Sequence, residues 1–94
     1  MQVPRKKIEA NLATKGFIKE KTHHTYFYHE YKGKRTGAYT YTSHGSNYKN
    51  YGISLLKRMK TELRLDTITQ VARLCECPMK EKEYINILKN KNII

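Results

Sequence analysis

The 94-residue sequence predicts an α+β fold in which one helix, three strands and then three more helices follow in order. Apolar residues at helical spacing lie near the N-terminus and again after residue 52, which indicates helices in both places. Between them, residues 21–44 alternate aromatic and β-branched side chains as strands do. We expect a single domain with a modest core, because only 38% of the residues are hydrophobic.

The first helix is predicted over residues 4–15. Pro4 suits the first turn of a helix, and Ile8 and Leu12 lie four residues apart on one of its faces. Gly16 can end this helix in a left-handed conformation, which other residues rarely adopt. A first strand should begin directly after it.

Residues 21–44 predict a long hairpin whose turn is Lys32-Gly33. This segment contains five tyrosines and all four histidines of the chain. Alternation along the middle strand predicts that His23 and His24 point to opposite faces. Both faces then carry aromatic rings and imidazoles, so the pattern leaves open which face is buried.

A loop is predicted at residues 43–52, followed by a helix over residues 53–63 with an apolar stripe and basic exposed positions. A third helix begins at Asp66 or Thr67, because Gln70 stands where a capping box requires it. A last helix is predicted over residues 80–91.

The net charge of +11 is unevenly distributed, since residues 1–65 carry +10 of it. Such a positive field attracts polyanions such as RNA, although a merely solubilising surface is the alternative interpretation. No apolar run is long enough to span a bilayer, and no secretory signal is present, so we expect a cytoplasmic protein. Cys75 and Cys77 lie too close together for a useful disulfide, which agrees with a reducing compartment.

Several short motifs occur in a characteristic order: Gly16-Phe17, then residues 22–26 (Thr-His-His-Thr-Tyr), Gly33 at the turn, Ser43-His44, and residues 52–56 (Gly-Ile-Ser-Leu-Leu). In this order the chain resembles the HicA family of small toxins over roughly residues 5–75. The resemblance implies a fold like a double-stranded-RNA-binding domain, with a core at residues 1–65 and a helical extension at residues 66–94 packed on it. It also implies a metal-independent endoribonuclease of messenger RNA that an antitoxin partner neutralises.

The candidate catalytic residues are His23, which holds the family's histidine position, and His24, to which a one-residue shift would move that position. An imidazole with a pKa near 6.5 can take a proton from a ribose 2′-hydroxyl at neutral pH. We expect no cofactor and no metal ion for such a reaction. A structural role for both rings, packed against tyrosines or wet, is the alternative.

The candidate nucleic-acid-binding residues are the cations of the strands, the hairpin turn and the second helix, together with a loop histidine: Lys19, Lys21, Lys32, Lys34, Arg35, His44, Lys57, Arg58 and Lys60. Exposed tyrosines on a sheet could stack unpaired bases, but Tyr26, Phe27, Tyr39 and Tyr41 also fit a core or cross-strand pairs.

Three function classes therefore stay open. The first is an RNA-cleaving toxin, as a monomer or a homodimer, and the second is a nucleic-acid-binding module of the same fold without catalysis. The third is a protein-interaction or inhibitor module whose tyrosine-rich surface binds an acidic protein.

Overall fold

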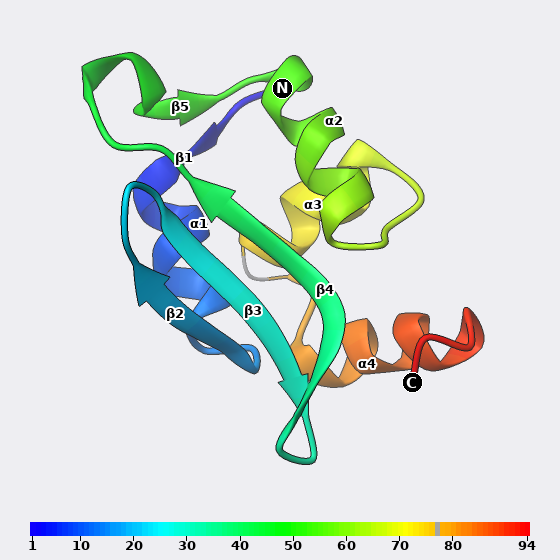
Figure 1. Cartoon of the computed structure of the whole chain (residues 1–94). Coiled ribbons are helices and arrows are strands. Elements are labelled where there is room, and N and C mark those ends of the chain that lie inside the picture. The colour runs from blue at the N-terminus through cyan, green and yellow to red at the C-terminus, as the bar shows by residue number, and fades with distance from the viewer. Residues whose placement is uncertain (77) are drawn as a thin grey trace.

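The computed structural model, which describes every residue except Cys77, has the predicted α+β architecture (Figure 1). One helix precedes a three-stranded antiparallel sheet, and three helices follow it. The elements are β1 (Val3–Pro4), α1 (Arg5–Leu12), β2 (Phe17–Lys21), β3 (Thr25–Tyr31), β4 (Lys34–Thr42), the 3₁₀ turn η1 (Ser46–Tyr48), β5 (Asn50–Tyr51), α2 (Ile53–Glu62), α3 (Ile68–Cys75) and α4 (Glu81–Asn90). Of the two neighbouring cysteines, Cys75 is buried, and Cys77 lies outside the described residues.

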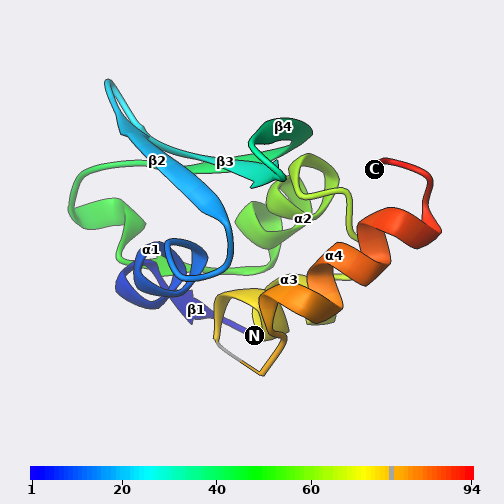
Figure 2. The same cartoon turned by 90° about the horizontal axis from the view of Figure 1, so that it is seen from below.

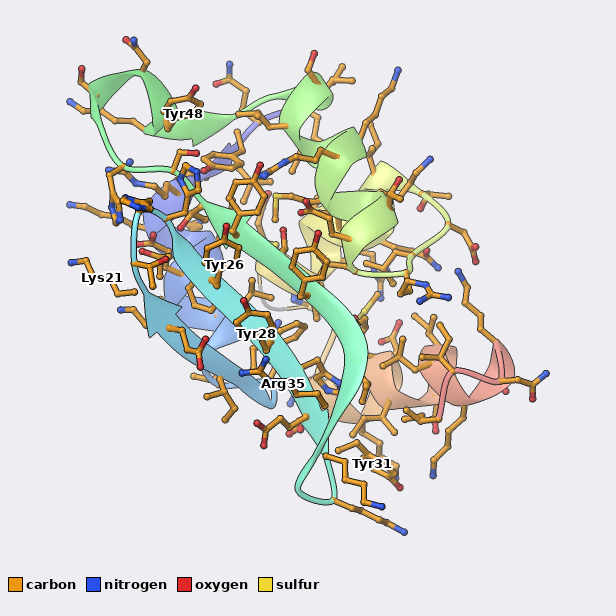
Figure 3. The ribbon with its side chains drawn as sticks, viewed as in Figure 1. Lys21, Tyr26, Tyr28, Tyr31, Arg35 and Tyr48 are labelled. Carbon is orange, nitrogen blue, oxygen red and sulfur yellow. The ribbon has the colours of Figure 1, made fainter. Side chains whose placement is uncertain are left out.

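The main sheet has the strand order β2-β3-β4, so β3 is its central strand. Along β3, Thr25, Phe27 and His29 are buried, while Tyr26 and Tyr28 are half-buried. The two sets point to opposite faces because side chains alternate along a strand. Figure 3 shows Tyr26 and Tyr28 on the face turned toward the viewer, and in the same view in Figure 1 α1 and α3 lie behind the sheet.

The helical layer covers the other face of the sheet (Figure 2). In this layer α3 contacts both α1 and α2, and α2 also contacts the edge strand β4. Leu74 of α3 and Tyr84 and Leu88 of α4 are fully buried in the same cluster as Phe27. The C-terminal helices therefore complete the core that the sheet begins.

A second, two-stranded sheet was not predicted: β5 lies in the segment that was predicted as a loop, and β1 precedes α1, which begins at Arg5 and not at Pro4. Val3 of β1 pairs with Tyr51 of β5, and both side chains are fully buried. The Tyr51 hydroxyl accepts a hydrogen bond of 2.8 Å from the amide of Ser43. This sheet joins the first residues to the segment before α2. Strands of two residues are too short to show a sequence pattern, so this long-range pairing could not be predicted.

The first helix ends earlier than predicted, at Leu12 rather than at residue 15. Lys15 is instead nearly buried, and its ammonium donates to the carbonyl of Leu74 at the end of α3. Asn11 donates to the carbonyl of Cys75 in the same way, at 2.7 Å. These donors satisfy carbonyls that a helix end leaves free, and they bind α1 to α3.

The backbone is left-handed at two predicted sites, the end of the first helix and the hairpin turn. Gly16 has φ +84°, and a Cβ there would collide with the carboxylate of Glu81. At the hairpin, Lys32 and Gly33 have φ +52° and +80°, as a type I′ turn requires. The capping box is confirmed as well, because Thr67 and Gln70 exchange the two hydrogen bonds that define it.

No helix among the described residues is both long and apolar enough to cross a membrane.

The position of α4 gives a first testable prediction. The Tyr84 hydroxyl is buried and donates a hydrogen bond of 2.7 Å to the carbonyl of Leu63, at the end of α2. We expect Tyr84→Phe to lower the free energy of unfolding by about 1–2 kcal/mol, because it leaves that buried carbonyl unpaired. Urea denaturation measures this loss, and Tyr48→Phe at an exposed site should cost almost nothing. Equal losses for the two variants would mean that this bond does not hold α4 in place.

Candidate nucleic-acid interface

The two candidate catalytic histidines lie in a turn and not on the middle strand as predicted. β2 ends at Lys21 and β3 begins at Thr25, and the amide of Thr22 donates to the carbonyl of His24 at 2.8 Å to close the turn between them. His23 is exposed in this turn, whereas His24 is half-buried. The prediction that the two rings project from opposite faces of a strand was therefore wrong. The two histidines differ instead in how far their side chains are buried.

Four tyrosines form a continuous aromatic surface on the uncovered face of the sheet. Tyr26 and Tyr28 come from β3, Tyr39 and Tyr41 come from β4, and we call this set the tyrosine face. Neighbouring rings have centroids 5.4–6.2 Å apart, including the cross-strand pairs Tyr26–Tyr41 and Tyr28–Tyr39. Tyr39 is the most open of the four, with 36% of its surface exposed.

The expectation for the aromatic residues of the hairpin thus divides into two outcomes. Phe27 belongs to the core, where it is fully buried. The three tyrosines considered with it are cross-strand partners, but on the face that the helices leave open.

His24 joins one end of the tyrosine face. Its ring centroid lies 4.9 Å from that of Tyr41 and 6.2 Å from that of Tyr26. Its Nδ1 atom is buried without a hydrogen-bond partner. The turn therefore holds this imidazole against the aromatic surface, with one nitrogen shielded from water.

Two arginines lie on the tyrosine face, one near each end. The guanidinium of Arg58, from α2, is 3.8 Å from the ring centroid of Tyr41, and it also donates to the Tyr41 carbonyl at 3.0 Å. The guanidinium of Arg35 is 4.0 Å from the ring centroid of Tyr28, and Figure 3 shows the two side chains together. Stacking on an aromatic ring leaves the edge of a guanidinium free for hydrogen bonds; Arg58 uses part of this edge for the Tyr41 carbonyl, whereas the Arg35 side chain is 53% exposed.

Each arginine also has an acidic neighbour. Arg35 pairs with Glu20 at 3.2 Å in an exposed bridge, which contributes little in water. Arg58 lies 3.9 Å from Glu62, and Glu62 accepts a hydrogen bond of 2.9 Å from Thr40. Burial raises the pKa of the Glu62 carboxyl above its usual value, while the Thr40 hydrogen bond and the Arg58 charge oppose this rise.

The structure therefore gathers three of the predicted site residues on one surface: His24, Arg35 and Arg58. The other predicted residues surround it at various distances. Lys19 and Lys21 are exposed on β2, but they lie opposite Phe27 and Thr25, which are on the buried face of β3. The two lysines therefore project from the side of the sheet away from the tyrosine face. Lys32 and Lys34 lie at the hairpin end, His44 is exposed in the loop after β4, Lys57 is exposed on α2 and Lys60 is half-buried there.

His29 was not among the candidate site residues, and among the described residues it is the fully buried histidine. Its ring packs between Phe17 and Tyr84, with both centroid distances at 5.0 Å. Nδ1 shares a hydrogen bond of 3.1 Å with the Thr36 hydroxyl, while Nε2 has no partner. Burial lowers the pKa of His29 from 6.5 to about 4, so the ring is neutral at physiological pH and belongs to the core.

Within the described residues, no three His, Cys, Asp or Glu side chains are grouped as metal ligands. Comparison of the chain with protein-family models, with curated proteins and with solved structures finds no match. The resemblance to HicA toxins therefore stays a prediction from the motifs and their order in this sequence.

The buried histidine predicts how stability depends on pH. Below pH 6.5 the unfolded chain binds a proton on His29, whereas the folded chain binds it only near pH 4. The free energy of unfolding therefore decreases as the pH is lowered from 6.5 to 4. The loss reaches about 3 kcal/mol at its largest. We expect His29→Gln to remove this part of the pH dependence between pH 6.5 and 4, as measured by urea denaturation at several pH values. A pH profile identical to that of the wild type would show that His29 takes up protons freely in the folded state.

Proposed function

We propose that the chain is a small RNA-interacting protein that binds unpaired RNA on the tyrosine face and cleaves it without a metal ion, in the manner of a HicA-like toxin. One observation carries the proposal: an open sheet face joins four tyrosines, an imidazole and two guanidinium groups. RNA offers ligands for each of these, because it has flat bases, phosphates and an ionisable 2′-hydroxyl.

The tyrosine face supports binding of unpaired bases in preference to a duplex. Bases that are free of a partner can stack on aromatic side chains, and each such contact contributes about 1–3 kcal/mol. Tyr39 and the neighbouring Tyr28 are the best placed, since one is the most exposed ring and the other carries Arg35. Stacking of this kind tolerates any base, so we expect weak sequence preference from this surface alone.

The net charge of +11 supplies the second contribution. Arg35 and Arg58 lie on the face, and the exposed lysines of β2, the hairpin and α2 extend the positive field around it. Phosphate contacts raise affinity without reading sequence, and that affinity falls as salt increases.

Cleavage requires a base, a cation and a leaving group in one place. In the proposed reaction an imidazole removes the 2′-hydroxyl proton, and the 2′-oxygen attacks the adjacent phosphorus. The bond from phosphorus to the 5′-oxygen breaks, and that oxygen takes up a proton. The products are a 2′,3′-cyclic phosphate and a 5′-hydroxyl, so no water and no metal ion enter this step.

His24 is the better candidate for the proton transfer. Its ring and the Arg58 guanidinium both contact the ring of Tyr41, so base and cation flank one residue of the binding surface. The cation can stabilise the added negative charge at phosphorus. His23 is exposed in the same turn, which suits a role in protonating the leaving oxygen.

A second candidate, RNA binding without catalysis, is favoured by the packing of His24. The ring lies against Tyr41 and Tyr26 with its Nδ1 shielded, as a structural aromatic residue would lie. In that case the imidazole extends the stacking surface and moves no proton. The antitoxin partner implied by the HicA resemblance is a further part of the proposal, and an acidic protein would suit this cationic surface.

The cleavage proposal predicts a defined product and a defined loss. Purified protein incubated with labelled single-stranded RNA in EDTA should yield fragments that end in 2′,3′-cyclic phosphate, detectable by mass spectrometry. His24→Ala should reduce the rate about 10²–10⁴-fold, because the proton acceptor is removed. A control is Asn86→Ala, at an exposed site on α4 outside the candidate interface, which should keep most of the activity.

Binding of the same RNA should survive in His24→Ala to within a few fold, since the four tyrosines remain. If wild-type protein binds the RNA but leaves it intact, the catalytic part of the proposal fails and the non-catalytic candidate stands. If RNA is not bound even at low salt, both candidates fail.

A further inference from the structure

A groove beside the hairpin end borders the tyrosine face at Arg35 and has no role in the reaction above. It has a volume of about 380 Å³ and runs between the hairpin and the residues after α4. Its walls include an aromatic ring, three cations and two isoleucines: Tyr31, Lys32, Lys34, Arg35, Ile93 and Ile94. We call it the hairpin groove. Its volume lies in the range of sites that hold small organic ligands.

The aromatic wall of the groove is surrounded by positive charge. The ammonium groups of Lys32 and Lys89 lie 5.4 and 5.3 Å from the ring centroid of Tyr31. Lys34 pairs with Tyr31 across the hairpin. A hydrogen bond from Lys89 lowers the pKa of the Tyr31 phenol, and the charges of Lys32 and Lys89 lower it further. The groove therefore favours an anionic ligand.

The apolar wall is held in place by the end of α4. Asn92 adopts φ +60°, and the amide of Ile93 donates to the carbonyl of Leu88 at 3.0 Å, which is the Schellman geometry of a helix end. Ile93 and Ile94 are half-buried and pack against the core. A flat apolar group can rest on this wall while an attached anion reaches the lysines.

Arg35 connects the groove to the tyrosine face. Its side chain lines the groove, and its guanidinium lies over the ring of Tyr28 on the uncovered face of the sheet. Figure 3 places Arg35 beside Tyr28, and Tyr31 farther along the hairpin next to α4. An RNA strand bound across the tyrosine face would therefore reach Arg35 where the face ends, and the hairpin groove lies just beyond Arg35.

We propose that the hairpin groove is a second nucleotide subsite, which takes one phosphate-bearing nucleotide of the same RNA strand that crosses the tyrosine face. The inference depends on the proposed function, because it assigns the direction in which the bound RNA leaves the reaction site. The base lies against Ile93, Ile94 and Tyr31, and the phosphate lies among Lys32, Lys34 and Lys89.

The separation of the two sites sets the length of RNA that can reach both. Tyr31 follows His24 by seven residues along β3, which is about 23 Å at roughly 3.3 Å per residue. Stacked nucleotides rise about 3.4 Å each, so about seven stacked nucleotides are enough to span that distance. A trinucleotide stacked on the tyrosine face is too short to enter the groove.

The test compares short and long RNA on a pair of matched variants. The ligands are 2′-O-methyl oligouridylates of three and nine nucleotides, which lack the hydroxyl needed for cleavage, and affinity is read by isothermal titration calorimetry at several salt concentrations. The groove variant is Lys32→Gln/Lys34→Gln. The control is Lys6→Gln/Lys7→Gln, which removes two exposed charges from α1.

We expect the groove variant to lose about tenfold in affinity for the nine-nucleotide ligand, and to lose little for the trinucleotide. Its salt slope with the longer ligand should fall by about 0.7 for each phosphate contact removed. The control should lose little with either ligand. Equal losses for both ligands, or equal losses in both variants, would overturn the subsite.

The two proposals fail in different ways. A groove variant that still cleaves RNA, but that keeps the full affinity gain from three to nine nucleotides, would refute the subsite and leave the proposed function intact. Wild-type protein that binds neither oligonucleotide would refute both.

Discussion

The burial of two β3 side chains, Phe27 and His29, is the constraint that determines how the rest of the structure is arranged. These two side chains are fully buried against the helical layer, and alternation then commits Tyr26 and Tyr28 to the opposite face. Slipping the pairing by one residue would expose the core and bury the tyrosines, so the hydrophobic pattern fixes the register. The tyrosine face is in this sense a consequence of core packing, and it is open to a ligand because none of the described helices covers it.

The same packing determines where the cations of the candidate site lie. Met59 and Leu56 anchor the inner side of α2 in the core, and Arg58, next to Met59, is thereby held at the edge of β4 with its guanidinium over Tyr41. The turn before β3 places His24 on the same ring. Stability and the proposed chemistry thus share Tyr41, whose carbonyl and ring both bind Arg58.

Local signals in the sequence were enough to predict the order of elements, the Lys32-Gly33 turn and the capping box at Thr67, because each depends on neighbouring residues. The turn at residues 22–24 was missed, since threonine and histidine next to aromatic residues read as strand. Long-range features had no local signal: the β1–β5 pairing and the capping of α3 by Lys15 both join segments distant in sequence. Of the candidate site, composition identified the residue types, but only the side-chain contacts of the folded chain show that His24, Arg35 and Arg58 share one surface.

The central claim, that RNA binds through the tyrosine face, is tested most directly by replacing one of its rings. Tyr39 and Tyr48 have similar exposures, 36% and 38%, but only Tyr39 lies on that face. With a non-cleavable single-stranded RNA, Tyr39→Leu should weaken binding at least fivefold, equal to about 1 kcal/mol for one lost stack, while Tyr48→Leu should bind as the wild type does. Unchanged affinity in Tyr39→Leu, with its fold intact by circular dichroism, would contradict the account.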